Sequence, residues 1–591
     1  MLLDKLNPQQ KEAVISQCNV LITACPGSGK TRVLTHKIGY EIEKLNSSKQ
    51  FILALTFTNR AADEIKRRLE KMNLDASRLW AGTIHSFCLE WILRPYAGYN
   101  DRLKNGFAIA DQYYCEQILK ELKRNQVEDY VSIVTRINRS GHPLNDSVIK
   151  QEIANKYHKR LKSESLIDYD LILYYAFRLL TDVPQIATTL SSMFAYIFVD
   201  EYQDTQDLQY GIIGQIMKAG NGANRIFLVG DPDQAIYSSL GGVAKSVSEI
   251  KKEIGGYDIR EMFLSGNYRS TQRIIDFYRN FQSNDIPIIS LADNAAQSGI
   301  ITFNDYINKN NLYEEIAKLI NLSLEKGIPE HEICVLAPQW WLITKIGKRL
   351  KQLLPHVNFD ATGLSPIGKS KENIWYLLAR LLLTRPSANM YVTRIRWAND
   401  WLRELNSIVN LCNDEFSSGK KILRLLNSIT PKEDEGLDYL TVAFNQVMKF
   451  LKINIEDHLL LKQQWNSFFE GAKNRILTEE YDVPTDIESF RSMFCNMKGV
   501  LINTCQGVKG EEFQTVIAFG LLRNYLPHWS EIDWSDPTIE VPSSKKLLYV
   551  IASRARTNLH LIAERGRTTR SNRSLEINRQ LASVEFEYDE L

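Results

Sequence analysis

The sequence predicts an α/β protein with two parallel sheets, each interrupted by a mainly helical insertion. The first observation is a glycine-rich loop, Ala24–Thr31, that joins a short apolar run to a segment with helical periodicity. The second is a series of further apolar runs, most of them continuous rather than alternating, as in central strands of parallel sheets. The third is that these runs fall into two groups, separated by long helical stretches.

The elements follow from these patterns in chain order. The expected strands are 20–24, 51–56, 196–199, 226–229, 333–336, 500–504, 516–519 and 559–563. Helical periodicity dominates from about residue 88 to 190 and from about residue 373 to 494. The expected first sheet domain comprises 1–89 and 183–258, and its helical insertion is 90–182. The expected second sheet domain comprises 259–372 and 496–591, and its short helical insertion is 373–495. We expect the basic stretch 565–573 and the acidic end 585–591 to form a solvated tail.

Composition is that of a soluble globular protein, with 44 % hydrophobic and 24 % charged residues over 591 positions. No apolar run is long enough to cross a bilayer, so no membrane partner is expected, and the first residues lack the layout of a signal peptide. The eight cysteines are scattered without a Cys-x-x-Cys pair. This argues against a zinc or iron–sulfur site and predicts a reducing, cytoplasmic location. Net charge is only +2, so contact with a polyanion must depend on local basic and aromatic surfaces.

The loop before Lys30 has the features of a site for nucleotide phosphates. Two glycines allow tight turns, so backbone N–H groups of the loop and of the helix N-terminus can point at phosphate oxygens. Lys30 would reach the β and γ phosphates of ATP, and the Thr31 hydroxyl would bind Mg²⁺. Ala24 replaces the usual first glycine, which is tolerable where φ is negative. A turn that merely precedes a helix would explain the loop taken alone. The expected ATP-binding residues of the loop are Ala24, Cys25, Pro26, Gly27, Ser28, Gly29, Lys30 and Thr31.

Two later strands also end in polar groups. Asp200 and Glu201 follow the run 196–199, at the edge of a parallel sheet where ligands bind. Asp200 would hold Mg²⁺ through water, and Glu201 would polarise the attacking water. After the next run, Gln234 could sense the γ-phosphate and Tyr237 could face a nucleobase. An acidic helix cap or a plain strand–turn would explain either string in isolation.

Together with further strings in the same order, these motifs resemble the UvrD/Rep family of superfamily 1 helicases over nearly the whole chain. The resemblance implies two RecA-like domains of the P-loop NTPase class, with ATP bound between them. The further strings are LNPQQ at 6–10, LTFTNRAA at 55–62, GTIHSF at 82–87, DYDLI at 168–172, NYRST at 267–271, KGEEF at 509–513 and LYVIASRA at 548–555.

The resemblance also implies roles for single residues. Gln10 would read the adenine edge, Tyr268 would stack on the base with Arg32 on its opposite face, and Glu512 would contact the ribose. Arg269 and Arg554 would be two arginine fingers on the γ-phosphate. The catalytic set would be Lys30, Glu201, Gln234, Arg269 and Arg554. The DNA-contacting set would be Phe57, Thr58, Asn59, His85, Tyr237 and Thr504, with Phe57 as a stacking candidate.

The chain departs from the family pattern at several positions. Ser239 and Leu240 stand where the family usually has a Trp-Arg pair, and the tryptophan would contribute base stacking of about 1–3 kcal/mol per base. Gln506 replaces a common histidine, and an acid expected before Tyr549 is missing. The second helical insertion is short and lacks the family's Pro-x-Arg-Gly-Ile-Gly string. No nuclease motif is present in the sequence.

Two functions from different classes remain open on this evidence. The first is a Mg²⁺- and ATP-dependent DNA translocase and helicase acting on single-stranded or tailed duplex DNA, for which the resemblance implies 3′→5′ polarity. The second is an ATPase subunit that senses DNA ends or gaps and regulates a partner nuclease, resembling the helicase-like subunit of Gabija anti-phage systems. The complete set of ATP-site residues favours the motor, whereas the missing Trp-Arg pair and the short insertion favour the sensor. Nothing in the later motifs supports a metabolic P-loop enzyme.

Overall fold

The chain folds into two compact units. The first comprises Met1–Ala108, Ile133–Gln339 and Thr504–Leu591, and the second comprises Ile109–Ser132 and Trp340–Asn503. Ser239 and Leu240, where the family's Trp-Arg pair is expected, lie outside the described residues. The computed structural model describes residues 3–590 except 46, 125, 129–130, 239–240, 362–364, 369, 371–372, 410–417, 478–484, 495–498, 537–538, 540 and 570.

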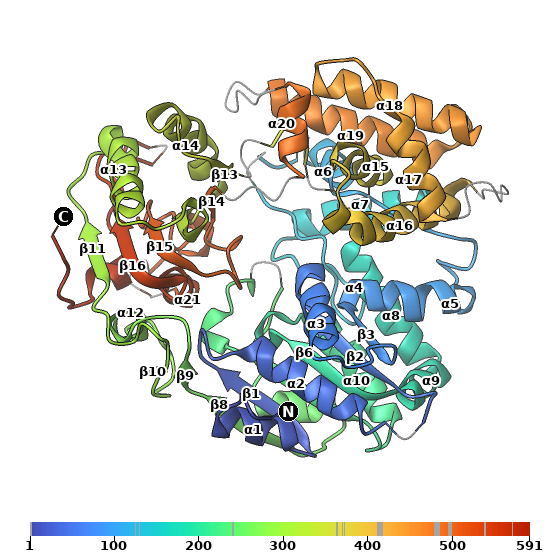
Figure 1. Cartoon of the computed structure of the whole chain (residues 1–591). Helices are drawn as coiled ribbons and strands as arrows, with labels where there is room; N and C mark the ends of the chain where they lie inside the picture. The colour runs from blue at the N-terminus through green and yellow to red at the C-terminus, as the bar shows by residue number, and fades with distance from the viewer. Residues whose placement is uncertain are drawn as a thin grey trace. The chain divides into compact units, whose positions relative to one another are not determined.

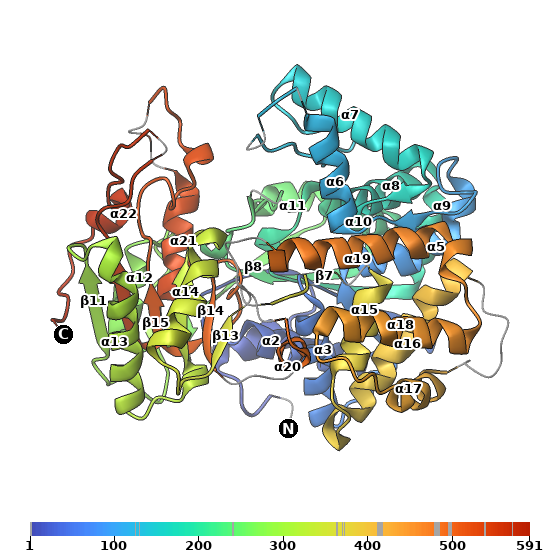
Figure 2. The ribbon, with the colours of Figure 1, turned by 90° about the horizontal axis from the view of Figure 1, so that it is seen from above.

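The first unit contains the first predicted sheet, which is parallel throughout. Its strand order is β3 (Leu79–Thr83), β2 (Phe51–Thr56), β6 (Phe194–Asp200), β7 (Arg225–Gly230), β1 (Asn19–Ala24) and β8 (Ile259–Leu264). The helices α2 (Lys30–Ile42) and α3 (Asn59–Lys71) cover one face, and α9 (Pro184–Met193) and α10 (Asp207–Ala219) cover the other, as Figures 1 and 2 show.

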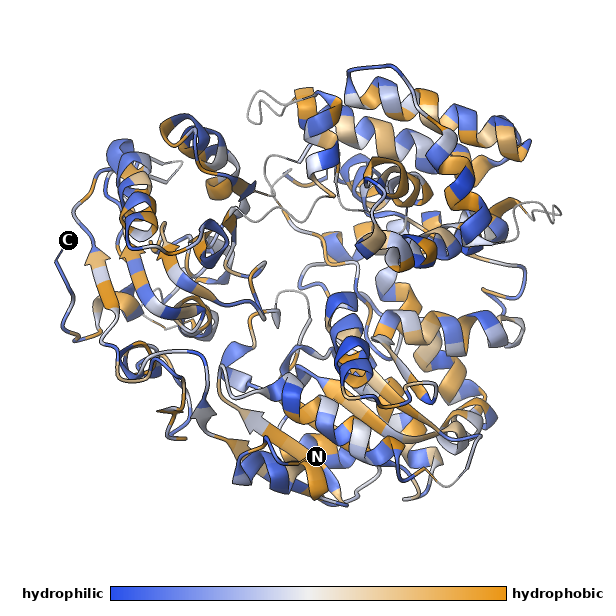
Figure 3. Cartoon of the chain, viewed as in Figure 1, coloured by the Kyte–Doolittle hydropathy of each residue, from blue (hydrophilic) through white to orange (hydrophobic). Residues whose placement is uncertain are grey.

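The central strands of this sheet are strongly hydrophobic (Figure 3), and Val20, Ile22, Phe198 and Phe227 are fully buried. Burial on both faces explains why these strands are continuous apolar runs in the sequence. Because the strands are parallel, the carboxyl ends of β1, β6, β7 and β8 meet at one edge of the sheet.

The first unit also holds parallel strands of the second sheet, in the order β11 (Ile300–Asn304), β16 (Ala555–Ile562), β15 (Phe513–Ala518) and β12 (Ile333–Ala337). Three helices pack against them, α12 (Gln272–Arg279), α13 (Leu312–Glu325) and α21 (Pro542–Ala552). Glu512 directly precedes β15 and Arg554 directly precedes β16. Both side chains therefore leave the second sheet at the amino ends of its strands.

The predicted parallel α/β architecture is confirmed, but the sequence analysis missed several strands. β8 lies at the edge of its sheet, where Arg260 and Glu261 are exposed and interrupt the apolar run. β3 is short and contains Gly82, and β11 has one fully buried residue, Ile301. Edge position and partial burial remove the apolar continuity on which the prediction of strands depended.

Both stretches with helical periodicity are mainly helical. The first includes α5 (Arg94–Tyr96), α6 (Gln112–Lys123), α7 (Val148–Ser163), α8 (Tyr169–Asp182) and α9, and α4 (Ile84–Phe87) directly precedes it. It also holds two short paired strands, β4 (Ala108–Ile109) and β5 (Leu166–Ile167). Asp168 caps α8 by accepting a hydrogen bond from the Leu171 N–H, and its carboxylate also accepts one from the Tyr157 hydroxyl at 2.8 Å. The string 168–172 thus has a structural role in starting a helix.

The second unit is mainly helical and has its own core around Trp375, Trp401 and Phe444. The Gln464 side chain accepts a hydrogen bond from the Ile374 N–H, and the Trp375 indole donates to the Leu461 carbonyl. β13 (Phe359–Ala361) and β14 (Val500–Thr504) pair in parallel. The helices are α14 (Trp340–Leu353), α15 (Ile374–Leu383), α16 (Tyr391–Val409), α17 (Gly419–Ser428), α18 (Gly436–Leu451), α19 (Leu459–Leu477) and α20 (Ile487–Ser492), together with α6.

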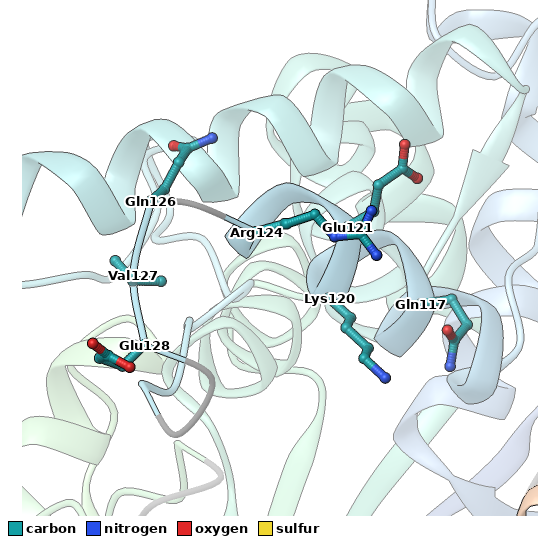
Figure 4. Close-up of a pocket in the computed structure, with 7 residues that line it drawn as sticks. All are labelled: Gln117, Lys120, Glu121, Arg124, Gln126, Val127 and Glu128. Carbon is teal, nitrogen blue, oxygen red and sulfur yellow. The ribbon is translucent and has the colours of Figure 1, made fainter.

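A hollow of about 980 Å³ opens on α6 and the residues after it (Figure 4). Its lining mixes both signs of charge. The lining residues are Gln117, Lys120, Glu121, Arg124, Gln126, Val127 and Glu128. Over the described part of the chain, none of the helices has the length and apolar character needed to span a membrane.

The expectation of a solvated acidic tail is wrong. The Phe586 ring lies edge-on to Phe277 of α12 at 5.1 Å, and Asp589 forms an ion pair with Arg273 at 2.8 Å. The Asp589 N–H donates to the Ile301 carbonyl, and the Asp589 carboxylate accepts from the Ile301 N–H. Aromatic rings within an acidic stretch supply the apolar contacts that hold it against β11. We name residues 585–590 the C-terminal strap.

Candidate nucleotide and DNA site

The phosphate loop lies between β1 and α2. Ala24 ends β1 in register with Leu264, so it has the extended backbone that a residue other than glycine tolerates. Gly27 and Gly29 have φ of 69° and 80°, in the region that favours glycine. No side chain caps the start of α2 at Lys30. The first N–H groups of the helix are therefore available for an anion, as expected for a phosphate site.

Residues of the sequence that follow β8 hold this loop in place. The Asn267 side chain donates to the Pro26 carbonyl at 2.8 Å, and the Tyr268 N–H donates to the Gly27 carbonyl at 2.9 Å. A Cβ atom on Gly27 would lie 2.7 Å from the Cβ of Arg269. A side chain at position 27 would therefore collide with the segment that carries the first predicted arginine finger.

Asp200 and Glu201 lie at the carboxyl end of β6, where the backbone turns into the left-handed region at Glu201. Burial raises the pKa of Asp200 to about 7, and the adjacent Glu201 adds to this. Burial also acts to raise the pKa of Glu201, but Lys30 and Lys509 outweigh it and hold that pKa below its usual value. Glu201 is thus the ionised member of the pair.

Gln234, which follows β7, is connected to both sheets. Its amide donates to Asp231 at 2.7 Å, and its side-chain oxygen accepts from the Arg554 guanidinium at 2.8 Å. Its backbone carbonyl accepts from Lys509 at 2.6 Å. Lys509 also forms an ion pair with buried Asp204. The predicted sensor of the γ-phosphate and the second predicted finger are therefore in direct contact.

Arg554 is a fully buried arginine, 1 % exposed. Burial and the nearby Arg269 lower its pKa, whereas the charge of Glu201 acts in the opposite direction. Arg269 donates to the Ser553 carbonyl at 2.9 Å and forms an ion pair with Glu512 at 2.6 Å. Glu512 also pairs with Arg556 at 3.0 Å. The two predicted fingers and the predicted ribose contact therefore form one cluster at the amino ends of β15 and β16.

The residues expected around adenine lie near the start of the chain. Gln10 is buried, and its side chain donates to the Ser28 carbonyl at 3.0 Å and accepts from the Asn7 N–H. The Asn7 side chain donates to the Tyr268 hydroxyl at 2.8 Å, while the Tyr268 ring remains 41 % exposed. Arg32 donates to the Lys5 carbonyl at 2.7 Å. These contacts hold Tyr268 with an open ring next to the phosphate loop.

Two predicted DNA-contacting residues stack on each other. The Phe57 and Tyr237 rings are 4.7 Å apart with an interplanar angle of 19°, and Phe57 is 43 % exposed. The Lys509 ammonium lies over the Tyr237 ring at 5.1 Å, and the Tyr237 hydroxyl donates to the Gln506 carbonyl. Lys509 thus touches this aromatic pair, Asp204 and the backbone of Gln234.

The remaining predicted DNA contacts have local roles as well. Thr58 caps α3 by accepting from the Ala61 N–H, and Asn59 is the first residue of that helix. The Thr504 hydroxyl accepts from the Gly507 N–H at 3.1 Å. The His85 ring lies edge-on to Tyr169 at 5.1 Å, and burial lowers the pKa of His85 to about 4. His85 is therefore neutral near pH 7 and can act only as a neutral polar group.

The donor set fits a magnesium ion that is shared with a nucleotide. In the residues that the structure describes, no group of three or more His, Cys, Asp or Glu side chains could hold a metal by itself. Nucleotide-bound Mg²⁺ needs only one or two protein oxygens, because phosphates and waters complete its shell. Asp200 is a buried carboxylate with a raised pKa, and a cation would stabilise its ionised form.

Sequence reasoning missed several residues of this site. No role was predicted for Lys509 or Asp204, although together they bridge the two sheets. Asp231 and Asn267 were likewise not singled out, although one orients Gln234 and the other holds the phosphate loop. Asp204, Asp231 and Lys509 follow predicted strands, which was the available signal, whereas Asn267 follows β8, which was not predicted. The partners of Asp204, Lys509 and Asn267 lie far away in the sequence.

Comparison with known proteins agrees with this geometry. Residues 6–255 match the family model of the UvrD/REP helicase N-terminal domain. The chain is 32 % identical over 296 residues to the ATP-dependent DNA helicase PcrA of Staphylococcus aureus, an alignment that covers 46 % of this chain and 39 % of that protein. It is also 32 % identical over 302 residues to the ATP-dependent DNA helicase UvrD1 of Mycobacterium tuberculosis, covering 46 % and 38 %.

The matched region thus spans about two fifths of the length of these relatives. It includes the phosphate loop and the acidic pair, and the family model ends before Arg269. The ordered motifs, the parallel sheets and these matches agree with one another, and residues 6–255 are similar to the N-terminal domain of UvrD/REP helicases.

Proposed function

We propose that this chain is an ATP-dependent DNA translocase and helicase that hydrolyses Mg²⁺-bound ATP and moves 3′→5′ along single-stranded DNA. The observation that carries the proposal is the meeting of groups from both sheets around Gln234. Arg554, from the amino end of β16, bonds to its side chain, and Lys509 bonds to its backbone. ATP bound there would contact residues of both sheets at once.

In this proposal the first RecA-like domain comprises 1–89 and 183–258, with the insertion 90–182. The second comprises 259–372 and 496–591, with the insertion 373–495. Arg269 and Arg554 then belong to the second domain, and Lys30 and Glu201 belong to the first.

In this proposal, the residues of the site have separate roles in phosphoryl transfer. Lys30 and the N–H groups at the start of α2 would bind the phosphates. Glu201, which the neighbouring lysines keep ionised, would orient and polarise the attacking water. Arg269 and Arg554 would stabilise the charge that develops on the γ-phosphate. Thr31 and Asp200 would hold Mg²⁺, which neutralises phosphate charge when bound.

A coupling to DNA follows from the contacts of Lys509. This side chain touches Gln234, which would sense the γ-phosphate, and the Tyr237 ring, which stacks on Phe57. A movement of the second sheet that displaces Lys509 would therefore reach the aromatic pair directly. We propose that Phe57 and Tyr237 stack with DNA bases and that ATP turnover changes this stack.

The test is an ATPase assay with and without single-stranded DNA, followed by unwinding of duplexes with a 3′ or a 5′ tail. We expect DNA-stimulated hydrolysis and preferential unwinding from the 3′ tail. Lys30→Ala should abolish turnover, because it removes the cation that binds the phosphates. Arg67→Ala, which removes an exposed guanidinium paired with Glu64, is the matched control and should retain turnover. Unwinding only from the 5′ tail would contradict the proposed polarity.

A DNA-sensing ATPase that regulates a partner nuclease is the second candidate. The observation that favours it is the Ser239–Leu240 pair in place of the aromatic and basic residues expected there, which removes one stacking platform. DNA-stimulated hydrolysis without unwinding of either duplex would favour this candidate. In that case a nuclease encoded next to this protein should change its cleavage rate when the chain and ATP are added.

A further inference from the structure

A loop between β15 and α21 exposes two large aromatic side chains. We name residues 524–536 the tryptophan loop. Trp529 is 43 % exposed and Trp534 is 58 % exposed. Indole rings are large and apolar with one polar N–H, so two of them exposed five positions apart in one loop offer a candidate contact surface.

The loop is anchored firmly to the second sheet domain. Leu526 and Ile532 are buried, 1 % and 6 % exposed. The Leu526 carbonyl accepts a hydrogen bond from the Asn578 side chain at 2.5 Å, and the Tyr525 carbonyl accepts one from Gln339 at 2.8 Å. The exposed rings are therefore presented by a preformed segment, which lowers the entropic cost of binding.

The two tryptophans are linked through the backbone of the loop. The Trp534 indole N–H donates to the Trp529 carbonyl at 3.2 Å, so its hydrogen-bonding need is met within the loop. The His528 and Trp529 rings lie 5.3 Å apart. What remains exposed at Trp534 is chiefly aromatic carbon, which gains free energy when another molecule covers it.

The loop carries negative charge only. It contains Glu531, Asp533 and Asp536 and no lysine or arginine. Asp533 accepts hydrogen bonds from the N–H and hydroxyl of Ser535, which lower its pKa, so it is ionised at neutral pH. Glu531 accepts a hydrogen bond from Ser543. These acids would repel a DNA backbone and attract lysine or arginine side chains, which also bind favourably over indole faces.

We propose that the tryptophan loop is a docking site for a segment of another protein that combines basic and apolar side chains. The apolar side chains would cover Trp529 and Trp534, and the basic ones would pair with Asp533 and Asp536. A second copy of this chain fits poorly, because a symmetric contact through the same loop would place like charges together. The proposal does not depend on the reaction at the nucleotide site.

The test is a selection of random peptides displayed on phage against the full-length protein. Peptides that bind the Trp529→Ala/Trp534→Ala variant are removed first. We expect the enriched peptides to contain lysine or arginine beside leucine, phenylalanine or similar residues. As synthetic peptides, they should bind the wild-type chain at least about tenfold more tightly than the double variant.

Trp341→Ala is the matched control, because Trp341 is 45 % exposed and lies outside the loop. This variant should bind the peptides as the wild type does. Asp533→Asn/Asp536→Asn should weaken binding and reduce its dependence on salt. Each variant is checked by its unfolding temperature and its ATP turnover, both of which should match the wild type.

Several results would overturn the proposal. Enrichment of acidic peptides, or enriched peptides that bind the double variant equally well, would mean that the loop does not select basic segments. Loss of affinity for a short single-stranded oligonucleotide in the double variant would identify a DNA surface instead. A dimer in wild-type sedimentation that the double variant lacks would identify a contact between copies.

Discussion

Two clusters of charged residues in the first unit show opposite electrostatics. The site cluster comprises Lys30, Asp200, Glu201 and Asp231, and the scaffold cluster comprises Arg139, Asp207, Lys245 and Glu253. In the scaffold cluster, Arg139 pairs with Asp207 at 2.7 Å and with Glu253 at 2.6 Å, and Lys245 pairs with the same two acids. Burial acts to raise the pKa of Asp207 and of Glu253, but the hydrogen bonds from Arg139 and Lys245 have the larger effect, so both pKa values are lowered.

In the site cluster, burial is the larger effect on the pKa of two of the acids. It raises the pKa of Asp200 to about 7 and that of Asp231 to about 6, although Lys30 acts in the opposite direction on both. The scaffold cluster is thus electrostatically satisfied, whereas the site cluster carries more buried negative charge than its neighbours compensate. The paired charges of the scaffold cluster thus have a structural role, whereas the under-compensated buried charges of the site cluster lie where a bound cation would complete them.

The largest expected effect is on catalysis. Glu201→Gln should lower ATP turnover about 10²–10⁴-fold, because it removes the group that polarises water. The unfolding temperature should not rise, since Lys30 and Lys509 stabilise the ionised Glu201 and hold its pKa below the usual value. Glu253→Gln is the matched control from the scaffold cluster and should keep its turnover per folded molecule. An equal loss of turnover in both variants would contradict the assignment of a catalytic role to the site cluster alone.

The next effect is on stability. Arg139→Ala leaves two acids without their main partner and should lower the free energy of unfolding by about 1–3 kcal/mol, measured from urea midpoints. Removal of the exposed Arg67, which pairs with Glu64 on the helix surface, should cost about 0–1 kcal/mol. If both variants lost the same free energy of unfolding, the ion pairs of the scaffold cluster would contribute no more to stability than an exposed pair does.

The pH dependence of stability should differ between the clusters. The folded pKa of Asp200 is raised from 3.8 to about 7, so the folded state loses stability as pH rises through that interval. Asp200→Asn should therefore stabilise the nucleotide-free protein more at about pH 8 than at about pH 5. A gain that is equal at both pH values would contradict the raised pKa.

Asp207 should behave in the opposite way. Its folded pKa is lowered from 3.8, so its contribution is fully present above 3.8 and is lost only as pH falls through the folded value. Asp207→Asn should cost the same stability at about pH 5 and at about pH 8. Thermal unfolding of both variants over this range makes the comparison.

The smallest effect is expected at the C-terminal strap, where Asp589 and Arg273 form a partly exposed ion pair. Asp589→Asn should weaken the ion pair with Arg273 and cost about 0.5–1 kcal/mol. Hydrogen exchange at the Ile301 amide, whose N–H donates to Asp589, should become faster. Unchanged exchange at this amide would show that the strap is held by its aromatic rings alone.

Much of this fold could be predicted because buried parallel strands are continuous apolar runs. The phosphate loop was equally predictable, since Gly27, Gly29 and Lys30 are adjacent in the chain. Edge strands such as β8 were missed because their exposed charges hide the apolar pattern. The contacts of the strap were not predicted, because its acidic residues indicated a solvated segment although Phe586 and Tyr588 lie among them.

The site itself was only partly predictable. The positions after predicted strands pointed to Asp200, Glu201 and Gln234, because strand ends meet at one edge of a sheet. The contact of Lys509 with Asp204 was not predictable, since the two residues are 305 positions apart and a pairing at that distance depends on how the two sheets pack. Pattern analysis of one sequence contains no information on such packing.

The close approach of Gly27 to Arg269 has a consequence for engineering. Two stretches about 240 positions apart must be compatible at the level of single atoms, so neither can be exchanged independently. A chimera that imports the phosphate loop of a relative should import residues 267–269 from the same donor. In a library of recombined relatives, crossovers between these two stretches should give inactive variants more often than crossovers elsewhere.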